Sequence, residues 1–325
     1  MYFLGIDFGT SGARVCVTDA DGAPAFEDRR DFGELAEHER AGVWREALWD
    51  LIAGLPAPIR SQLDAIAIDG TSGTLIASDD TLSARHAPLL YDDGRAVDEA
   101  AHIARFAPPG HPAAAVTSGL AKLLWLKQRL GLTGARVYLN QADWLAGLLA
   151  EQVGFTDYHN ALKLGLDLDT LDWPDWVDQL ADAATLPRPV APGTMLAPLA
   201  RSRARYLGVN AACRVRAGTT DSIAAFLAAG LFEPGDAVTS LGSTLALKLL
   251  SEVRVESVEL GVYSHWFGRR WLAGGASNAG GAVLKTLFDE RRLAALSAAI
   301  DPGVASPLGY VPLVKPGERF PCTAP

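Results

Sequence analysis

The sequence predicts an α/β protein of two domains. Its 325 residues exceed what one hydrophobic core usually serves, and strand-like segments alternate with helical stripes. An arrangement of strand, small-residue turn and strand opens the chain and returns after residue 236. We therefore expect a first domain at 1–233 and a second at 234–325, divided at the turn-rich break Glu233-Pro234-Gly235-Asp236.

The composition is that of a globular chain, with 49% hydrophobic and 21% charged residues. Its 29 Lys and Arg against 38 Asp and Glu give a net charge of -9, so a nucleic-acid partner is not expected. The start of the chain does not resemble a secretory signal, and the most continuous apolar stretch, 223–232, is too short to span a bilayer. The sequence thus favours a soluble, cytoplasmic protein without a membrane partner.

The first domain is expected to open with a β-hairpin. Residues 2–8 and 14–18 are strand-like, Gly9-Thr10-Ser11-Gly12 forms the turn between them, and a second turn follows at 19–22. Apolar spacing predicts the remaining elements of this domain, which are helices at 43–54, 121–130 and 142–149, strands at 63–68 and 213–217, and a helix from Asp221 to Gly230. Residues 173–207 have weak periodicity and are expected to form loops and short helices on the surface.

The second domain repeats the opening pattern. Strands are expected at 237–241 and 245–250, joined by the turn Gly242-Ser243-Thr244. A further strand at 271–273 enters the glycine-rich run 274–281, and a helix follows through residue 288. Nothing periodic follows in the Pro- and Gly-rich residues 302–325, so the second domain looks incomplete.

Two turns suit the binding of phosphate. Glycines let a backbone approach a ligand closely, and small hydroxyl residues add donors, so Gly9-Thr10-Ser11-Gly12 and Gly242-Ser243-Thr244 could clamp one polyphosphate from two sides. Asp7, at the end of the first strand, could orient a metal-bound water or a substrate hydroxyl. The alternative is an ordinary hairpin whose aspartate is a turn acceptor. The P-loop pattern Gly-x-x-x-x-Gly-Lys-Ser/Thr does not occur in the sequence.

Asp221 follows two threonines and precedes a helix. An aspartate there is a good N-cap, and it could also act as a general base toward a sugar hydroxyl. Ser72, just past a buried strand, could bond sugar hydroxyls or simply belong to a tight turn. Gly274, Gly275 and Asn278 could border a nucleotide, although glycine also serves close packing of helix on strand. No two of the six histidines have the i, i+4 spacing of metal ligands, and none clusters with a cysteine, so a histidine metal site is not expected. Only His159 is a candidate for a residue of a binding pocket.

Taken together, these motifs resemble the FGGY carbohydrate kinases, of the actin/hexokinase/Hsp70-like ATPase superfamily. The residues that carry the resemblance are 5–11, 68–74, 217–222, 240–244 and 274–278. Segments 43–49, 141–145 and 157–165 look like the xylulokinase-like subgroup that includes the D-ribulose kinases of cyanobacteria and plants. The resemblance implies a two-domain actin-like (ribonuclease H-like) fold with a central cleft. Family members continue past residue 325 with a segment that completes the adenine pocket.

The resemblance also implies an activity and a set of roles. ATP, with Mg²⁺, would phosphorylate a hydroxyl of a ketopentose. D-ribulose is the preferred substrate in this interpretation, and D-xylulose is the alternative. Asp221 would be the base, Asp7 would bind sugar and help to place Mg²⁺, and Ser72 would contact the sugar. The residues expected to hold the nucleotide are Gly9, Thr10, Ser11, Gly242, Ser243, Thr244, Gly274, Gly275 and Asn278. The alternative is a non-catalytic, pseudokinase-like binding module or a truncated fragment.

Overall fold

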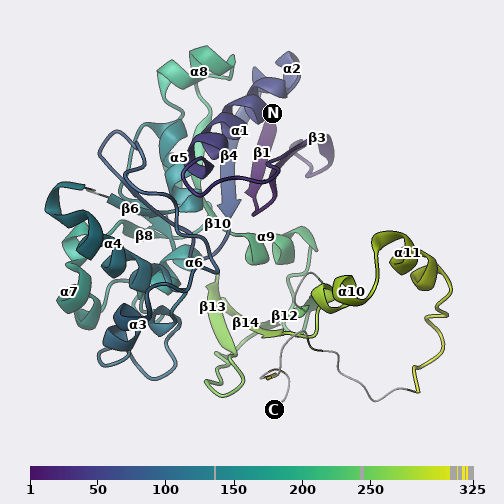
Figure 1. Cartoon of the computed structure of the whole chain (residues 1–325). Helices are drawn as coiled ribbons and strands as arrows, with labels where there is room; N and C mark the ends of the chain where they lie inside the picture. Colours follow the sequence, from purple (N-terminus) through teal and green to yellow (C-terminus); the bar gives the residue numbers. More distant parts are fainter. Residues whose placement is uncertain (135–136, 242–244, 308–312, 314–316, 319, 321–325) are drawn as a thin grey trace. The chain divides into compact units, whose positions relative to one another are not determined.

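The computed structural model describes residues 1–134, 137–241, 245–307, 313, 317–318 and 320 (Figure 1). The chain divides into two compact units, Met1–Ala225 and Phe226–Pro325, and helix α9 (Asp221–Ala228) contains the division. Within the described ranges, we find no helix that combines the length and the apolar character needed to cross a membrane.

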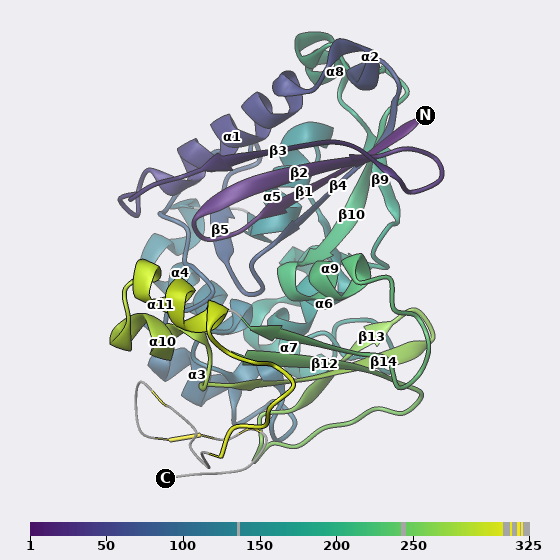
Figure 2. The same cartoon turned by 90° about the vertical axis from the view of Figure 1, so that its right-hand side faces the viewer.

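The first unit is built on a six-stranded sheet with the order β3-β2-β1-β4-β10-β9 (Figure 2). The strands are β1 (Tyr2–Phe8), β2 (Gly12–Thr18), β3 (Pro24–Asp31), β4 (Leu63–Gly70), β9 (Met195–Pro198) and β10 (Arg214–Thr220). The predicted opening hairpin is confirmed, since β1 and β2 pair antiparallel from Phe3 opposite Thr18 to Phe8 opposite Ala13. Strands β1, β4 and β10 run parallel, so their carboxyl ends share one edge of the sheet.

One face of this sheet carries the main hydrophobic core. Leu4, Ile6 and Phe8 alternate along β1 and are buried together with apolar residues of β2, β4 and β10. The helices that contribute to this core are α1 (Arg40–Gly54), α5 (Gln141–Ala150) and α8 (Arg201–Leu207), and the short α2 (Ala57–Arg60) follows α1. Trp44 and Trp144 are both buried in this core.

A second core in the same unit is mostly helical. It contains buried apolar residues of α3 (Val97–Ile103), α4 (Gly119–Gly134) and α7 (Asp175–Ala181), packed with the antiparallel pair β5 (Leu75–Ser78) and β6 (Val137–Asn140). The shorter elements of the unit are η1 (Pro112–Ala114), β7 (Phe155–Asp157), α6 (Tyr158–Ala161), η2 (Leu162–Leu164), η3 (Ala183–Thr185) and β8 (Arg188–Val190).

The structure corrects the expectation for residues 173–207. Strand β9 pairs antiparallel with β10 and extends the main sheet, and Val177 of α7 is fully buried. Strand β3 was not predicted either, because its sequence Pro-Ala-Phe-Glu-Asp-Arg-Arg-Asp is that of an exposed edge strand with a polar surface on both faces. Both strands are specified by their pairing partners rather than by their own apolar pattern.

The second unit contains an antiparallel sheet with the order β11-β12-β14-β13. Its elements are β11 (Ala237–Leu241), β12 (Leu245–Ser251), β13 (Tyr263–Phe267), β14 (Arg270–Ser277), α10 (Gly281–Leu287) and α11 (Glu290–Ala298). The two strands predicted on either side of residues 242–244 are confirmed, whereas that turn lies outside the described residues.

Candidate active site

Three aspartates meet at the carboxyl edge of the parallel strands in the first unit. Asp7 is the next-to-last residue of β1 and the direct register partner of Asp69 near the end of β4. In-register residues on neighbouring strands point to the same face, so these two carboxyl groups lie side by side. Asp221 opens α9 immediately after Thr220, which is paired with Gly70 at the end of β4. Strand pairing therefore gathers side chains that are 62 and 152 positions apart in the sequence.

The charges of these aspartates interact. Burial, together with the neighbouring Asp7 and Asp221, raises the pKa of Asp69 to about 8. Asp69 Oδ1 is buried and has no hydrogen-bond partner in the part of the chain that the structure describes. Asp7 is 39% exposed, and Arg14, its register partner on β2, lies 3.9 Å from Asp7 Oδ2. Asp69 therefore keeps its proton to a higher pH than an ordinary aspartate does.

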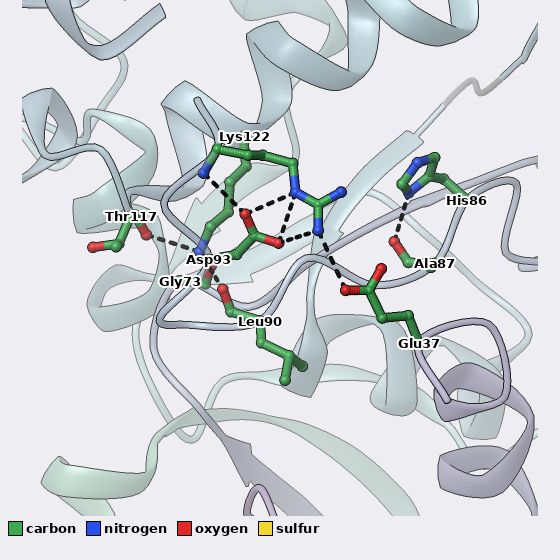
Figure 3. Close-up of polar contacts among 9 residues, drawn as sticks. Glu37, Gly73, His86, Ala87, Leu90, Asp93, Thr117 and Lys122 are labelled. Atoms are coloured by element: carbon green, nitrogen blue, oxygen red, sulfur yellow. Dashed lines mark hydrogen bonds and ion pairs between the residues drawn. The ribbon is translucent and has the colours of Figure 1, made fainter. Parts of the chain in front are cut away.

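The loop after β4 is held by two lysines, Lys122, which is buried, and Lys163, which is half-buried. Lys122 Nζ donates to the carbonyls of Gly73 (2.8 Å), Leu90 (2.5 Å) and Thr117 (2.9 Å), as Figure 3 shows. Burial lowers the pKa of Lys122 to about 7. These contacts fix the path of the loop that contains Ser72, whose side chain is half-buried.

The second of these lysines, Lys163, also joins the loop to the aspartates. Its Nζ donates to the carbonyl of Ser72 at 3.0 Å, and its charge interacts with Asp221. Burial lowers the pKa of Lys163, while Asp221 raises it. Lys163 therefore links the loop that contains Ser72 to the charge of Asp221.

Residues 157–160 form hydrogen bonds with the end of β10 at the same edge of the sheet. Asp157 Oδ1 accepts from the backbone N–H groups of His159 (2.9 Å) and Asn160 (3.1 Å) and so caps α6. His159 Nδ1 bonds Thr219 Oγ1 at 2.7 Å, and Asn160 Nδ2 donates to the carbonyl of Thr219 at 3.2 Å. This buried network holds the end of β10, so His159 positions the backbone before Asp221.

The first glycine loop keeps the predicted turn. The backbone N–H of Gly9 donates to the carbonyl of Gly12 at 3.0 Å, and the Ser11 carbonyl accepts from Phe32 N–H at 2.9 Å. Thr10 and Ser11 are exposed. The loop begins two residues after Asp7 in the chain, at the same end of β1.

Several residues of the second unit were predicted to bind the nucleotide, and those that the structure describes lie against other residues of that unit. Gly242, Ser243 and Thr244 lie outside the described residues. A Cβ on Gly275 would lie 2.5 Å from the ring of Phe320, so only glycine fits against that ring. Asn278 donates from its backbone N–H to Glu318 Oε2 at 2.8 Å and from Nδ2 to the Gly317 carbonyl at 3.2 Å.

Gly274 is buried on β14 opposite Lys248 of β12. A Cβ at this position would lie 2.9 Å from Lys248 Nζ. This atom is the far end of a flexible side chain, so the contact leaves open both interpretations of the glycine-rich run, close packing or a bound nucleotide.

Three residues of this site were missed by sequence reasoning. Asp69 belongs to a motif that was singled out, but Ser72 was chosen from it. Lys163 was noted only for its resemblance to a subgroup. Tyr91 received no role, although the pKa of its hydroxyl is raised by burial and by the charges of Asp92 and Asp221. A signal was available for Asp69, since it follows an apolar strand in the same way as Asp7 does.

A magnesium ion is implied by the resemblance, and the donor set fits one. Mg²⁺ usually takes one or two carboxylates together with waters and substrate phosphates. Asp7 and Asp69 offer adjacent carboxyl groups, with a buried oxygen of Asp69 still to be satisfied. Groups of three or more His, Cys, Asp or Glu suited to a metal are absent among the described residues, so any ion here depends on further oxygens from water or ligand.

Comparison with known proteins identifies the fold. No protein-family model matches the chain. The chain is similar to the solved structures of a gluconate kinase from Lactobacillus acidophilus (TM-score 0.78, 18% identity, 93% of this chain and 66% of that chain) and a xylulose kinase from Rhodospirillum rubrum (0.79, 19%, 93% and 68%). A glycerol kinase from Plasmodium falciparum with ADP is also similar (0.74, 17%, 92% and 66%).

These similarities define the class of fold. The chain has the actin-like ATPase fold of the carbohydrate kinases, which confirms the predicted fold class. It spans about two thirds (66%) of the length of the gluconate kinase and the glycerol kinase that it matches.

Proposed function

We propose that this protein is an ATP-dependent sugar kinase that phosphorylates a hydroxyl of a ketopentose, D-ribulose or D-xylulose. The observation that carries the proposal is the meeting of Asp7, Asp69 and Asp221 at the carboxyl edge of three parallel strands, the edge at which open α/β sheets bind ligands. The fold shared with gluconate, xylulose and glycerol kinases supports the same reaction type.

In this proposal, Asp221 is the general base. Its carboxylate at the start of α9 would accept the proton of the attacking sugar hydroxyl, and its Oδ1 accepts from the Ser222 backbone N–H at 2.7 Å. The proton passes to Asp221 as the hydroxyl oxygen attacks the terminal phosphorus and ADP leaves. Lys163 stabilises the charge of Asp221 before the transfer.

Asp7, Ser72 and the first glycine loop supply positioning. Asp7 accepts from a sugar hydroxyl, and Ser72 lies on the loop that the two lysines hold in place. Thr10 and Ser11 offer exposed donors to phosphate oxygens. Phosphoryl transfer depends mainly on alignment and charge stabilisation, which suits a site made of loops at a sheet edge.

The nucleotide in this proposal is ATP, and the residues of the second unit that would border it are Gly242, Ser243, Thr244, Gly274, Gly275 and Asn278. A magnesium ion held by Asp7 and Asp69 would neutralise phosphate charge. Both aspartates are placed by strand pairing, so the protein's own contribution is a rigid pair of carboxyl groups.

The choice of a ketopentose has two supports. One of the matched structures is a xylulose kinase, and segments 43–49, 141–145 and 157–165 look like the subgroup that phosphorylates D-ribulose. Segment 157–165 contains His159, Asn160 and Lys163, all of which contact residues next to Asp221 or Ser72. The resemblance thus falls on residues that shape the site.

A coupled assay of ADP release tests the proposal. The protein is given ATP and Mg²⁺ with D-ribulose, D-xylulose, glycerol or gluconate, and Asp221→Asn is compared with Asp21→Asn, an exposed aspartate in the turn before β3. We expect turnover with a ketopentose and a loss of roughly 10²- to 10⁴-fold in kcat for Asp221→Asn alone. Absence of sugar-dependent ADP release in the folded wild-type protein contradicts the proposal.

A further inference from the structure

A small cavity lies beside the aspartates in the first unit. It has a volume of about 120 Å³, and it is lined by Gly9, Thr10, Gly33, Leu35, Arg40, Trp44, Thr71, Leu90 and Gln141. Thr10 and Thr71 belong to the loops that follow Asp7 and Asp69, which places the cavity at the β1–β4 side of the site. Asp221 follows β10, the strand on the other side of β4.

The amide of Gln141 has a fixed orientation in the wall of this cavity. Its Oε1 accepts from the backbone N–H of Thr71 and from Thr71 Oγ1, both at 3.0 Å. A backbone N–H can only donate, so the amide oxygen must face Thr71 and the Nε2 group must point elsewhere. Thr71 Oγ1 also bonds Thr74 Oγ1 at 2.5 Å, which fixes the loop further.

The Nε2 group of Gln141 lacks an acceptor. Gln141 is 1% exposed, and no described residue accepts a hydrogen bond from Nε2. A buried donor without a partner costs roughly 1–3 kcal/mol. Gln141 lies at the start of α5, lines the cavity and keeps this donor unpaired. We therefore infer that a bound ligand supplies the acceptor for Nε2.

The dimensions of the cavity indicate the ligand. At roughly 30 Å³ for each water, the cavity holds the volume of about four waters, which is comparable to a two- or three-carbon end of a hydroxylated chain. Leu35, Trp44 and Leu90 supply an apolar wall, while Gln141, Thr71 and Arg40 supply polar groups. Such a mixture suits the partly apolar, oxygen-bearing end of a sugar.

We propose that Gln141 is a specificity-determining residue that donates its Nε2 hydrogen bond to an oxygen, carbonyl or hydroxyl, at the end of the sugar remote from the phosphorylated hydroxyl. This inference rests on the proposed sugar kinase function. The phosphorylated end lies toward Asp221 on the β10 side, and the remote end enters the cavity on the β1 side. Glycerol has three carbons, so it does not fill the cavity while it presents a hydroxyl to Asp221.

The substitution Gln141→Glu tests this pairing directly. Glutamate keeps an oxygen for Thr71 and replaces the donating Nε2 by an accepting oxygen, with almost the same shape. We expect at least tenfold weaker binding of D-ribulose and D-xylulose by titration calorimetry, with KM raised more than kcat is lowered. Affinity for glycerol should change less than threefold. The control Gln128→Glu introduces the same charge at an exposed position on α4 and should leave all values unchanged.

A second variant, Gln141→Met, removes the donor without adding charge and should also weaken pentose binding at least tenfold. Thermal unfolding of both variants establishes that they fold. Wild-type pentose affinity in either folded variant overturns the inference, as does an equal loss for glycerol and pentose. A wild-type protein that binds pentose in a Gln141-dependent manner, yet releases no ADP, refutes the kinase function and leaves the sugar subsite standing. A wild-type protein that binds no pentose overturns the subsite.

Discussion

Replacing Asp69 by asparagine should stabilise the protein, and increasingly so as the pH rises. In the folded chain, burial and the charges of Asp7 and Asp221 raise the pKa of Asp69 to about 8 from its ordinary value of 3.8. Between these two pH values, the folded state holds a proton that the unfolded state has released. The stability of the wild-type protein therefore falls as the pH rises through this window.

The size of this effect follows from the shift. Each pH unit between about 4 and 8 removes roughly 1 kcal/mol, so the full window costs on the order of 5 kcal/mol. Asparagine has nearly the same shape, stays neutral at every pH, and keeps a donor for Asp7. The difference in stability between Asp69→Asn and the wild-type protein should therefore grow by roughly 1 kcal/mol per pH unit from pH 5 to pH 8.

Urea unfolding at pH 5, 6, 7 and 8, followed by tryptophan fluorescence, measures this difference. The use of a difference between variant and wild-type protein removes the contribution of other buried acids, such as Asp143, whose pKa burial also raises to about 8. Asp21→Asn, in the exposed turn before β3, should show no such slope. A difference that stays constant from pH 5 to pH 8 would refute the placement of three mutually interacting carboxyl groups.

Three other changes have definite outcomes. Lys122→Met leaves three carbonyls without their donor and should cost roughly 3 kcal/mol in urea unfolding. Because the pKa of Lys122 is lowered to about 7, the wild-type protein should become more stable as the pH rises from about 7 to about 10, and Lys122→Met should abolish this rise. A rise that persists in the variant would show that another group causes it. Gly218→Ala places a Cβ 1.7 Å from the Ile68 carbonyl oxygen and should cost at least about 3 kcal/mol, so a melting temperature within about 2 °C of wild type contradicts the tight contact of β10 with β4. Thr219→Val removes the bond to His159 and should cost roughly 1–3 kcal/mol; a neutral result would show that this bond does not hold the end of β10.

The sequence predicted the parts of this protein that depend on neighbours along the chain. The hairpin of β1 and β2, the helices α1 and α5, and the helix that opens at Asp221 all follow from apolar periodicity and turn residues. Asp7 was singled out at the end of the first strand, and Asp221 because it follows two threonines and precedes a helix. Strands β3 and β9 were missed, since an edge strand derives its stability from the partner to which it is bonded.

Only the tertiary structure shows which residues that are far apart in the sequence lie close together in the folded chain. The parallel pairing of β1 with β4 puts Asp69 beside Asp7, and the pairing of β4 with β10 brings Asp221 to the same edge. In the same way, the role of Gln141 depends on Thr71, 70 residues away in the chain, which turns its amide. Local patterns record which backbone conformation a segment prefers, whereas the raised pKa of Asp69 and the unpaired donor of Gln141 arise from desolvation by groups that only folding brings close.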